Sequence, residues 1–155
     1  GNLVNRTIGM ANKYFDGVVT NTKINEEVDN KLIEETIGLK DVVENYMNGL
    51  EVSKAIASIF DVLRDCNKYI DETMPWVLAK DESKKDRLDT VLYNLIECIR
   101  ICTVLLQAFI PDTCEKIFNQ INTDNISYDS TSEFGGYKSG TRVNKAEVLF
   151  QRIEN

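Results

Sequence analysis

The chain has 155 residues, enough for one domain with its own core and too few for two. Apolar residues make up 43% of it, charged residues 28%, and there are only 2 prolines, which is typical of a folded, helix-rich globular protein. The histidine count of 0 excludes every mechanism that needs imidazole as acid, base or metal ligand.

The charge is unevenly distributed along the chain. The net charge of -7 excludes a protein whose whole surface binds the phosphates of a nucleic acid. Residues 1–24 are locally basic through Arg6, Lys13 and Lys23, whereas residues 25–51 carry two lysines and eight acids. Any contact with nucleic acid should therefore be local and lie away from the acidic segment.

Four cysteines, Cys66, Cys98, Cys102 and Cys114, form no C-x-x-C pair and have no histidine to complete a zinc site. We expect buried free thiols in a reducing compartment, and hence a cytoplasmic protein. Polar residues interrupt the apolar segment 90–110, which favours a central helix of a soluble bundle over a membrane span. The start at Gly1, without an initiator methionine, suggests a piece of a longer protein.

In chain order, the first predicted helix covers residues 1–15 and ends at Asp16-Gly17, with Leu3, Ile8, Met10 and Phe15 toward the core. The second runs over residues 25–47, from an acidic first turn to Asn48-Gly49. Its expected buried side is Val28, Leu32, Leu39, Val43 and Tyr46.

The third predicted helix starts near residue 52 and ends before Pro75. Its apolar stripe is Val52, Ala55, Ile56, Ile59, Phe60, Leu63, Cys66 and Ile70. A short helical segment can follow to Lys80, and a fourth helix over residues 83–109 is apolar on nearly all sides, so it should be the most enclosed.

The fifth predicted helix follows Pro111, with Asp112 and Glu115 at capping-box spacing, and ends near Ile121. These five helices predict an all-α antiparallel bundle over residues 1–122, and residues 123–155 form an irregular C-terminal tail. We expect the tail to dock on the bundle or on another domain of the polypeptide.

Two groups of residues could carry a function. Asn2, Asn5 and Arg6 lie on the first helix, where Asn2 and Arg6 share a face and present an amide beside a guanidinium, a pairing suited to base edges. A solvated helix start has the same residue types. No glycine-rich phosphate loop occurs, and the paired carboxylates, such as Asp71-Glu72, are typical of solvated charge.

The second group is Pro75-Trp76, which holds the only tryptophan of the chain. Proline fixes the backbone ahead of a large flat ring at a helix boundary, which can turn the ring outward as a stacking platform. A tryptophan in the bundle core has the same pattern, and patterning alone slightly favours that burial.

Three stretches closely resemble the anticodon-binding domain of methionyl-tRNA synthetases: GNLVNRTIGMANKYFDGVV (1–19), NKYIDETMPWVLAKD (67–81) and FIPDTCEKIFNQI (109–121). A terminal LFQRIE (149–154) is similar to the family's Leu-Phe-Pro-Arg-Ile-Glu. The chain departs from the family pattern at Met74, Val148 and Gln151.

The resemblance implies a C-terminal helical domain of a methionine-tRNA ligase that reads the CAU anticodon. Asn2 and Arg6 would contact anticodon bases, and Trp76, placed by Pro75, would stack on an unpaired base. The implied partners are the tRNA(Met) anticodon loop and the catalytic domain of the same polypeptide, with no membrane and no DNA. The family's ATP site and zinc knuckle belong to the catalytic part, so no cofactor is expected in this chain.

Two alternatives stay open at this point. One is the same helical module from another class I synthetase, such as those for Val, Leu, Ile or Cys. The other is a helical protein-interaction bundle without an RNA role, which predicts a buried Trp76.

Overall fold

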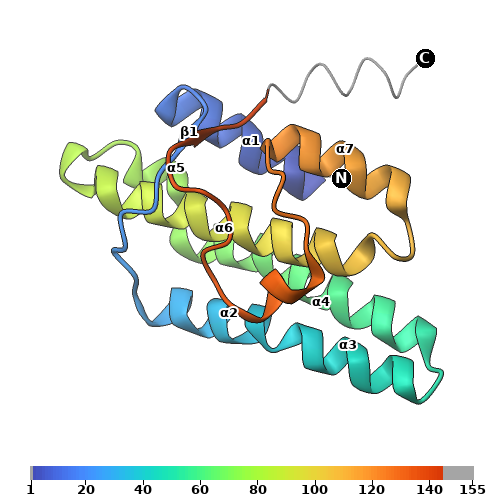
Figure 1. The fold of residues 1–155 in the computed structure, drawn as a ribbon. Coiled ribbons are helices and arrows are strands. Elements are labelled where there is room, and N and C mark those ends of the chain that lie inside the picture. Colours follow the sequence, from blue (N-terminus) through green and yellow to red (C-terminus); the bar gives the residue numbers. More distant parts are fainter. Residues whose placement is uncertain (1, 145–155) are drawn as a thin grey trace.

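The computed structural model describes residues 2–144 and shows the predicted all-α bundle (Figure 1). A pair of two-residue strands is added to it. The elements in chain order are α1 (Asn2–Phe15), β1 (Val18–Val19), α2 (Glu27–Ile37), α3 (Leu39–Asn48), α4 (Val52–Thr73), α5 (Pro75–Leu78), the 3-10 turn η1 (Glu82–Lys84), α6 (Lys85–Leu106), α7 (Pro111–Ile121), the 3-10 turn η2 (Tyr128–Ser132) and β2 (Thr141–Arg142).

Helix α6 forms the centre of the bundle, as its all-round apolar pattern predicts. Nearly every residue from 87 to 106 is buried, and α1, α2, α4 and α7 pack around it (Figure 1). One half of α6 shares a core with α1, α2 and the end of α4, and the other half shares a core with α3, the start of α4 and α7. The bundle is thus built around one central helix, α6, which contributes to both parts of the core.

The helix expected over residues 25–47 is two helices, because the chain bends at Gly38. Gly38 ends α2, with its N–H bonded to the carbonyl of Glu34, and also precedes the first turn of α3. Glycine is a weak helix former, so a break there costs little. The bend lets α2 pack on α6 while α3 packs on α4, which one straight helix does not do.

Residues 123–144 cross the face of α6 and pack on the bundle (Figure 1). Tyr137 and Val143 are buried in the same core cluster as Ile8 of α1. Strand β2 pairs antiparallel with β1, with Val18 opposite Arg142 and Val19 opposite Thr141, a pairing that is not predicted from the sequence. The terminal LFQRIE motif, Val148 and Gln151 lie outside the described residues.

A buried ion pair fixes this crossing segment. Glu97 and Arg100 are fully buried and bonded to each other, with Arg100 Nε 2.6 Å from Glu97 Oε1. The Glu97 carboxylate also accepts the backbone N–H groups of Gly135, Gly136 and Tyr137 at 2.7, 2.7 and 3.0 Å. Each charge is therefore compensated, which burial demands.

The width of the buried face of α4 and the capping of α7 and α2 differ from the predictions made from the sequence. Val52 and Phe60 of the predicted α4 stripe are exposed, because the buried side of α4 is narrower than its apolar pattern. The capping box predicted at Asp112 and Glu115 is wrong: α7 has Pro111 at its start and no side-chain cap. A capping box is present instead at Glu26 and Asp29, at the start of α2.

All four cysteines are buried and free, as predicted. Burial raises the pKa of the Cys102 thiol, and a hydrogen bond with Cys98 together with burial raises that of Cys66. Thiols held in the neutral form are poor nucleophiles, so these side chains act as core residues. Among residues 2–144, no helix combines the length and the apolar character that crossing a membrane requires.

Candidate nucleic-acid interface

Helix α1 is divided into a buried and an exposed face. Leu3, Val4, Thr7, Ile8 and Ala11 point into the bundle. Asn2, Arg6, Gly9 and Lys13 are exposed on the opposite side. Because α-helical positions recur at steps of three and four, these exposed residues form one continuous strip. The structure thus places Asn2 and Arg6 on one accessible face, as the spacing predicts.

Asn5 is not part of that accessible face. Its side-chain oxygen accepts a hydrogen bond from Gln120 Nε2 of α7 at 3.2 Å, and Gln120 is buried. Asn5 therefore links α1 to α7. Of the three polar residues singled out at the chain start, only Asn2 and Arg6 are open to a ligand.

Arg6 reaches across to the end of α4. Its Nη2 atom lies 3.4 Å from Oδ1 of Asp71, and both side chains are exposed. Asp71 is five positions before Trp76, so the ion pair ties the face of α1 to the segment that leads into the tryptophan. From the sequence, Asp71 is predicted to be solvated charge, since nothing in a local pattern indicates a partner 65 residues away.

The junction between α4 and α5 determines how Trp76 is presented. Met74 has a left-handed backbone (φ 49°, ψ 67°), and its N–H caps α4 by bonding to the carbonyl of Ile70 at 2.9 Å. Pro75 is buried and occupies the first position of α5, where its missing N–H costs nothing. The chain therefore turns sharply at Met74 and restarts on an anchored proline, directly before Trp76.

Trp76 is exposed, with 41% of its surface open to solvent, so the burial that patterning slightly favours is wrong. Met74 and Val77 beside it are 44% and 48% exposed. Three large apolar side chains together at a sharp turn form a surface that a ligand can cover, whereas single exposed apolar residues are ordinary. Val77 was not singled out from the sequence, and Met74 was named only as a departure from the family pattern.

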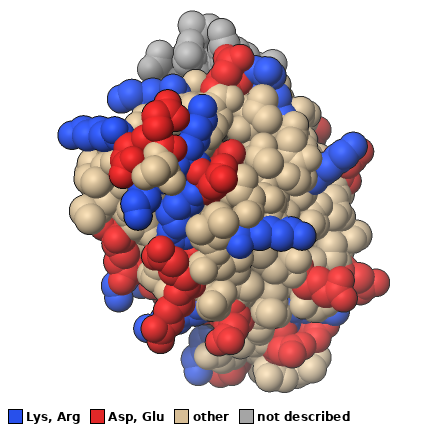
Figure 2. All heavy atoms as spheres, turned by 90° about the vertical axis from the view of Figure 1, so that its left-hand side faces the viewer, with Lys and Arg blue, Asp and Glu red and all other residues tan. Residues whose placement is uncertain are grey.

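The charge around this surface is mixed. Figure 2 faces the end of the bundle that carries α5, and it shows basic and acidic side chains interspersed beside a broad uncharged area. A uniformly positive field, which would bind any polyanion, is not seen on this face. A partner would be selected here by local contacts, in keeping with the net charge of -7.

Behind the junction, buried polar contacts fix the helices that carry it. Asp29 of α2 is fully buried, pairs with Arg87 of α6 and accepts a hydrogen bond from the hydroxyl of Tyr69 of α4 at 2.5 Å. Burial and the nearby Asp29 carboxylate raise the pKa of Tyr69, so its hydroxyl stays protonated. Three helices are thereby joined close to where α4 ends.

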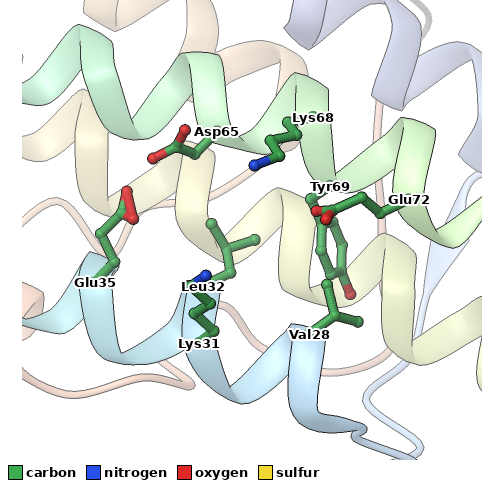
Figure 3. A pocket seen from close by; sticks show the side chains of 8 residues that line it. All are labelled: Val28, Lys31, Leu32, Glu35, Asp65, Lys68, Tyr69 and Glu72. Carbon is green, nitrogen blue, oxygen red and sulfur yellow. The ribbon is translucent and has the colours of Figure 1, made fainter.

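A separate hollow of about 150 Å³ lies between α2 and α4 (Figure 3). The carboxyl groups of Glu35 and Asp65 point toward each other across it, and Lys31 and Lys68 lie on its rim (Figure 3). Loss of solvent around the Glu35 carboxyl and its hydrogen bond with Asp65 raise its pKa from 4.5 to about 7. No set of three Cys, Asp or Glu side chains that could hold a metal ion is found within the described residues.

Comparisons with known proteins find clear relatives of this chain in sequence and in structure. A family model described as the anticodon binding domain of methionyl tRNA ligase matches residues 19–155. A methionine-tRNA ligase of Clostridium tetani is 47% identical over 154 residues, which cover 99% of this chain and 24% of that protein. The methionine-tRNA ligase of Bacillus subtilis is 44% identical over 161 residues.

Solved structures show the same fold. The free methionyl-tRNA synthetase of Mycobacterium tuberculosis superposes with a TM-score of 0.86 at 29% identity, over 94% of this chain and 30% of that one. This chain therefore spans about a quarter of the length of the curated relatives that it matches.

Proposed function

The chain belongs to the family of methionyl-tRNA ligase anticodon-binding domains, and on that premise we propose that it reads the CAU anticodon of tRNA(Met) through Asn2, Arg6 and Trp76. RNA is read in sequence mainly at unpaired bases, because the major groove of an A-form helix is too deep and narrow for side chains. An anticodon loop offers such bases. The observation that carries the proposal is the exposed ring of Trp76 on the anchored Pro75.

In this proposal Trp76 provides stacking and the strip on α1 provides discrimination. Stacking of a base on an aromatic ring contributes on the order of 1–3 kcal/mol and tolerates any base. Hydrogen bonds from Arg6 and Asn2 to base edges add selectivity, since a good bidentate pair discriminates by roughly 1–3 kcal/mol. The Arg6–Asp71 contact supports these separate roles of Trp76 and Arg6, because it holds the guanidinium on the side of α1 that faces the end of α4.

The rest of the polypeptide would supply the chemistry. We propose that this chain works beside a catalytic domain of a methionine-tRNA ligase in the cytoplasm, and that the ATP and zinc sites of the family lie in that other part. The length of the relatives, about four times that of this chain, supports this view.

The test is binding of an anticodon stem-loop with a CAU loop to the chain and to its Trp76→Ala and Arg6→Ala variants. We expect each variant to bind at least tenfold more weakly while its thermal unfolding is nearly unchanged, because both side chains are exposed. Variants that unfold early but bind normally would reject the assignment. Loops with the anticodons for Val, Leu, Ile or Cys tRNAs serve as competitors, and equal binding to them would reject selective reading of CAU.

A further inference from the structure

Among the described residues, 2–144, nothing requires Gly9 to be a glycine. It lies in the interior of α1, where glycine is a weaker helix former than alanine. In the part of the chain that the structure describes, no atom apart from the neighbouring backbone of α1 lies within 4 Å of the place where its Cβ would be. Packing inside the described residues therefore leaves room for a side chain, and the missing Cβ keeps the outer surface of α1 bare.

The bare patch is flanked by two cations on one face of the helix. Arg6 precedes Gly9 by three residues and Lys13 follows it by four, so all three share the exposed strip that begins at Asn2. At a rise of about 1.5 Å per residue, Arg6 and Lys13 are roughly 10 Å apart along α1. A surface that is basic at both ends and bare in the middle suits a phosphate-bearing chain lying close against the helix.

The strip ends at a hollow that leads back to α5. This hollow, of about 250 Å³, is lined by Lys13, Tyr14 and Phe15 of α1 and by Leu78 of α5. The Lys13 ammonium lies 5.6 Å from the centre of the Tyr14 ring, and Lys85 lies 5.9 Å from that of Phe15. Asp81 and Glu82 line it as well and offset the two lysines, so a phosphate here would depend on direct contact with Lys13 or Lys85 rather than on a general positive field.

We infer that the sugar–phosphate backbone of the anticodon loop lies along α1 from Arg6 to Lys13, and that Gly9 is glycine because this backbone approaches the helix too closely for a side chain. The inference rests on the proposed function and extends it from base contacts to a backbone contact. Phosphate contacts of this kind fix the register of a bound nucleic acid but carry no sequence preference. Another segment of a longer polypeptide is the rival occupant of the bare patch, and the experiment below separates the two.

The first arm of the experiment is Gly9→Ala, with thermal unfolding and stem-loop binding measured on the same protein. The added methyl group should raise Tm by about 2–4 °C, because alanine favours the helix and meets no neighbour. The same variant should bind the CAU stem-loop at least tenfold more weakly. Gly49→Ala is the control: Gly49 lies at the end of α3, its φ of -88° suits alanine, and its Cβ would make only ordinary contacts.

The second arm is Lys13→Gln, with the affinity measured over a range of salt concentrations. Loss of one phosphate contact should reduce the slope of log K against log[salt] by about 0.7, the value for single strands. Discrimination between CAU and other anticodons should not change. Lys54→Gln is the matched control, because Lys54 is at the other end of α4 from Asp71, roughly 25 Å away along the helix.

The possible outcomes distinguish failure of the backbone contact from failure of anticodon reading as such. A stabilised Gly9→Ala that binds RNA as well as the parent overturns the inference and assigns the patch to another segment, while weak binding by Trp76→Ala in the same assay keeps the proposed function. An unchanged salt slope in Lys13→Gln rejects the backbone contact at that residue. Failure of the parent chain to bind the stem-loop at all rejects both.

Discussion

The guanidinium of Arg6 lies 3.4 Å from the carboxylate of Asp71, and both side chains are exposed, Arg6 to 41% and Asp71 to 70%. Ion pairs in such surroundings contribute little to stability, because water screens them and two long side chains lose freedom. Asp71 therefore holds Arg6 in place without binding it strongly. A base edge that reaches the guanidinium can replace the carboxylate at small cost.

This relationship predicts a weak energetic coupling between Arg6 and Asp71. In a double-mutant cycle of Arg6→Ala and Asp71→Asn, followed by urea unfolding, we expect a coupling free energy below about 1 kcal/mol. The coupling should shrink further at high salt. A coupling of several kcal/mol would mean that Arg6 is locked by Asp71 and not available to a ligand.

The exposure of Trp76 predicts a clear optical signal, since it is the only tryptophan of the chain. Its fluorescence should be red-shifted and readily quenched by acrylamide. Addition of the CAU stem-loop should protect it from the quencher, because a stacked base covers the ring. Protection in the free protein would contradict the exposed position, and unchanged quenching in the complex would contradict the stacking.

The Glu35–Asp65 pair predicts a pH dependence of stability. The pKa of Glu35 is raised from 4.5 to about 7 in the folded chain, so the folded state binds the proton more tightly than the unfolded state. Its contribution is fully present below about pH 4.5 and is lost as the pH rises through about 7. We expect the loss to be on the order of 1 kcal/mol, because the side chain is partly solvated.

Unfolding in urea at pH 5 and at pH 8 measures this effect. Glu35→Gln should remove most of the difference between the two pH values, since glutamine keeps the shape but carries no proton to lose. Glu34→Gln, next to it on α2 and also exposed, is the control and should leave the difference intact. An unchanged pH dependence in Glu35→Gln would assign it to another group.

The buried Glu97–Arg100 pair predicts a large loss of stability on single substitution. Glu97→Ala should reduce the free energy of unfolding by about 3–5 kcal/mol, because it leaves the Arg100 guanidinium buried and three backbone N–H groups without their acceptor. Replacing both residues, as in Glu97→Met with Arg100→Leu, should cost less than Glu97→Ala with Arg100 kept. A single substitution without effect would show that residues 123–144 do not depend on this pair.

Much of the bundle follows from the periodicity of apolar residues, and the departures have physical causes. The bend at Gly38 escapes detection because Leu32, Leu39 and Val43 keep helical spacing through it. A hydrophobic period records which face is buried but not whether the axis continues in one direction. The division into α2 and α3 is set by what each half packs against.

The segment 123–144 is less predictable for a different reason. Its anchors are a few separate apolar side chains, Tyr137 and Val143, and backbone N–H groups that bond to Glu97. Backbone donors leave no trace in residue types. Glu97 and Arg100 are visible in the sequence as polar interruptions of an apolar helix, yet only the fold shows what they bind.

For the candidate site, the sequence identified the face of Asn2 and Arg6 and the Pro75-Trp76 junction, but left the position of the tryptophan ring open. The left-handed turn at Met74 decides it, and a non-glycine residue in that conformation is not expected from its type. The residue types of Asp71 and Gly9 likewise give no indication of a role in the site. Their roles depend on what lies near them in space: the guanidinium of Arg6 beside Asp71 and, among residues 2–144, open space where a Cβ of Gly9 would be.

The pairing of β1 with β2 has a consequence for the order in which the molecule can be completed during its synthesis. Within these 155 residues, the helix that carries Asn2 and Arg6 is made before the other elements, but the strand beside its end and part of the core beneath it come from residues 137–143. A growing chain on the ribosome cannot close this core until those residues have emerged. Helix α1 therefore reaches its final packing only after residues 137–143 have been added, although it precedes the rest of the bundle in the chain.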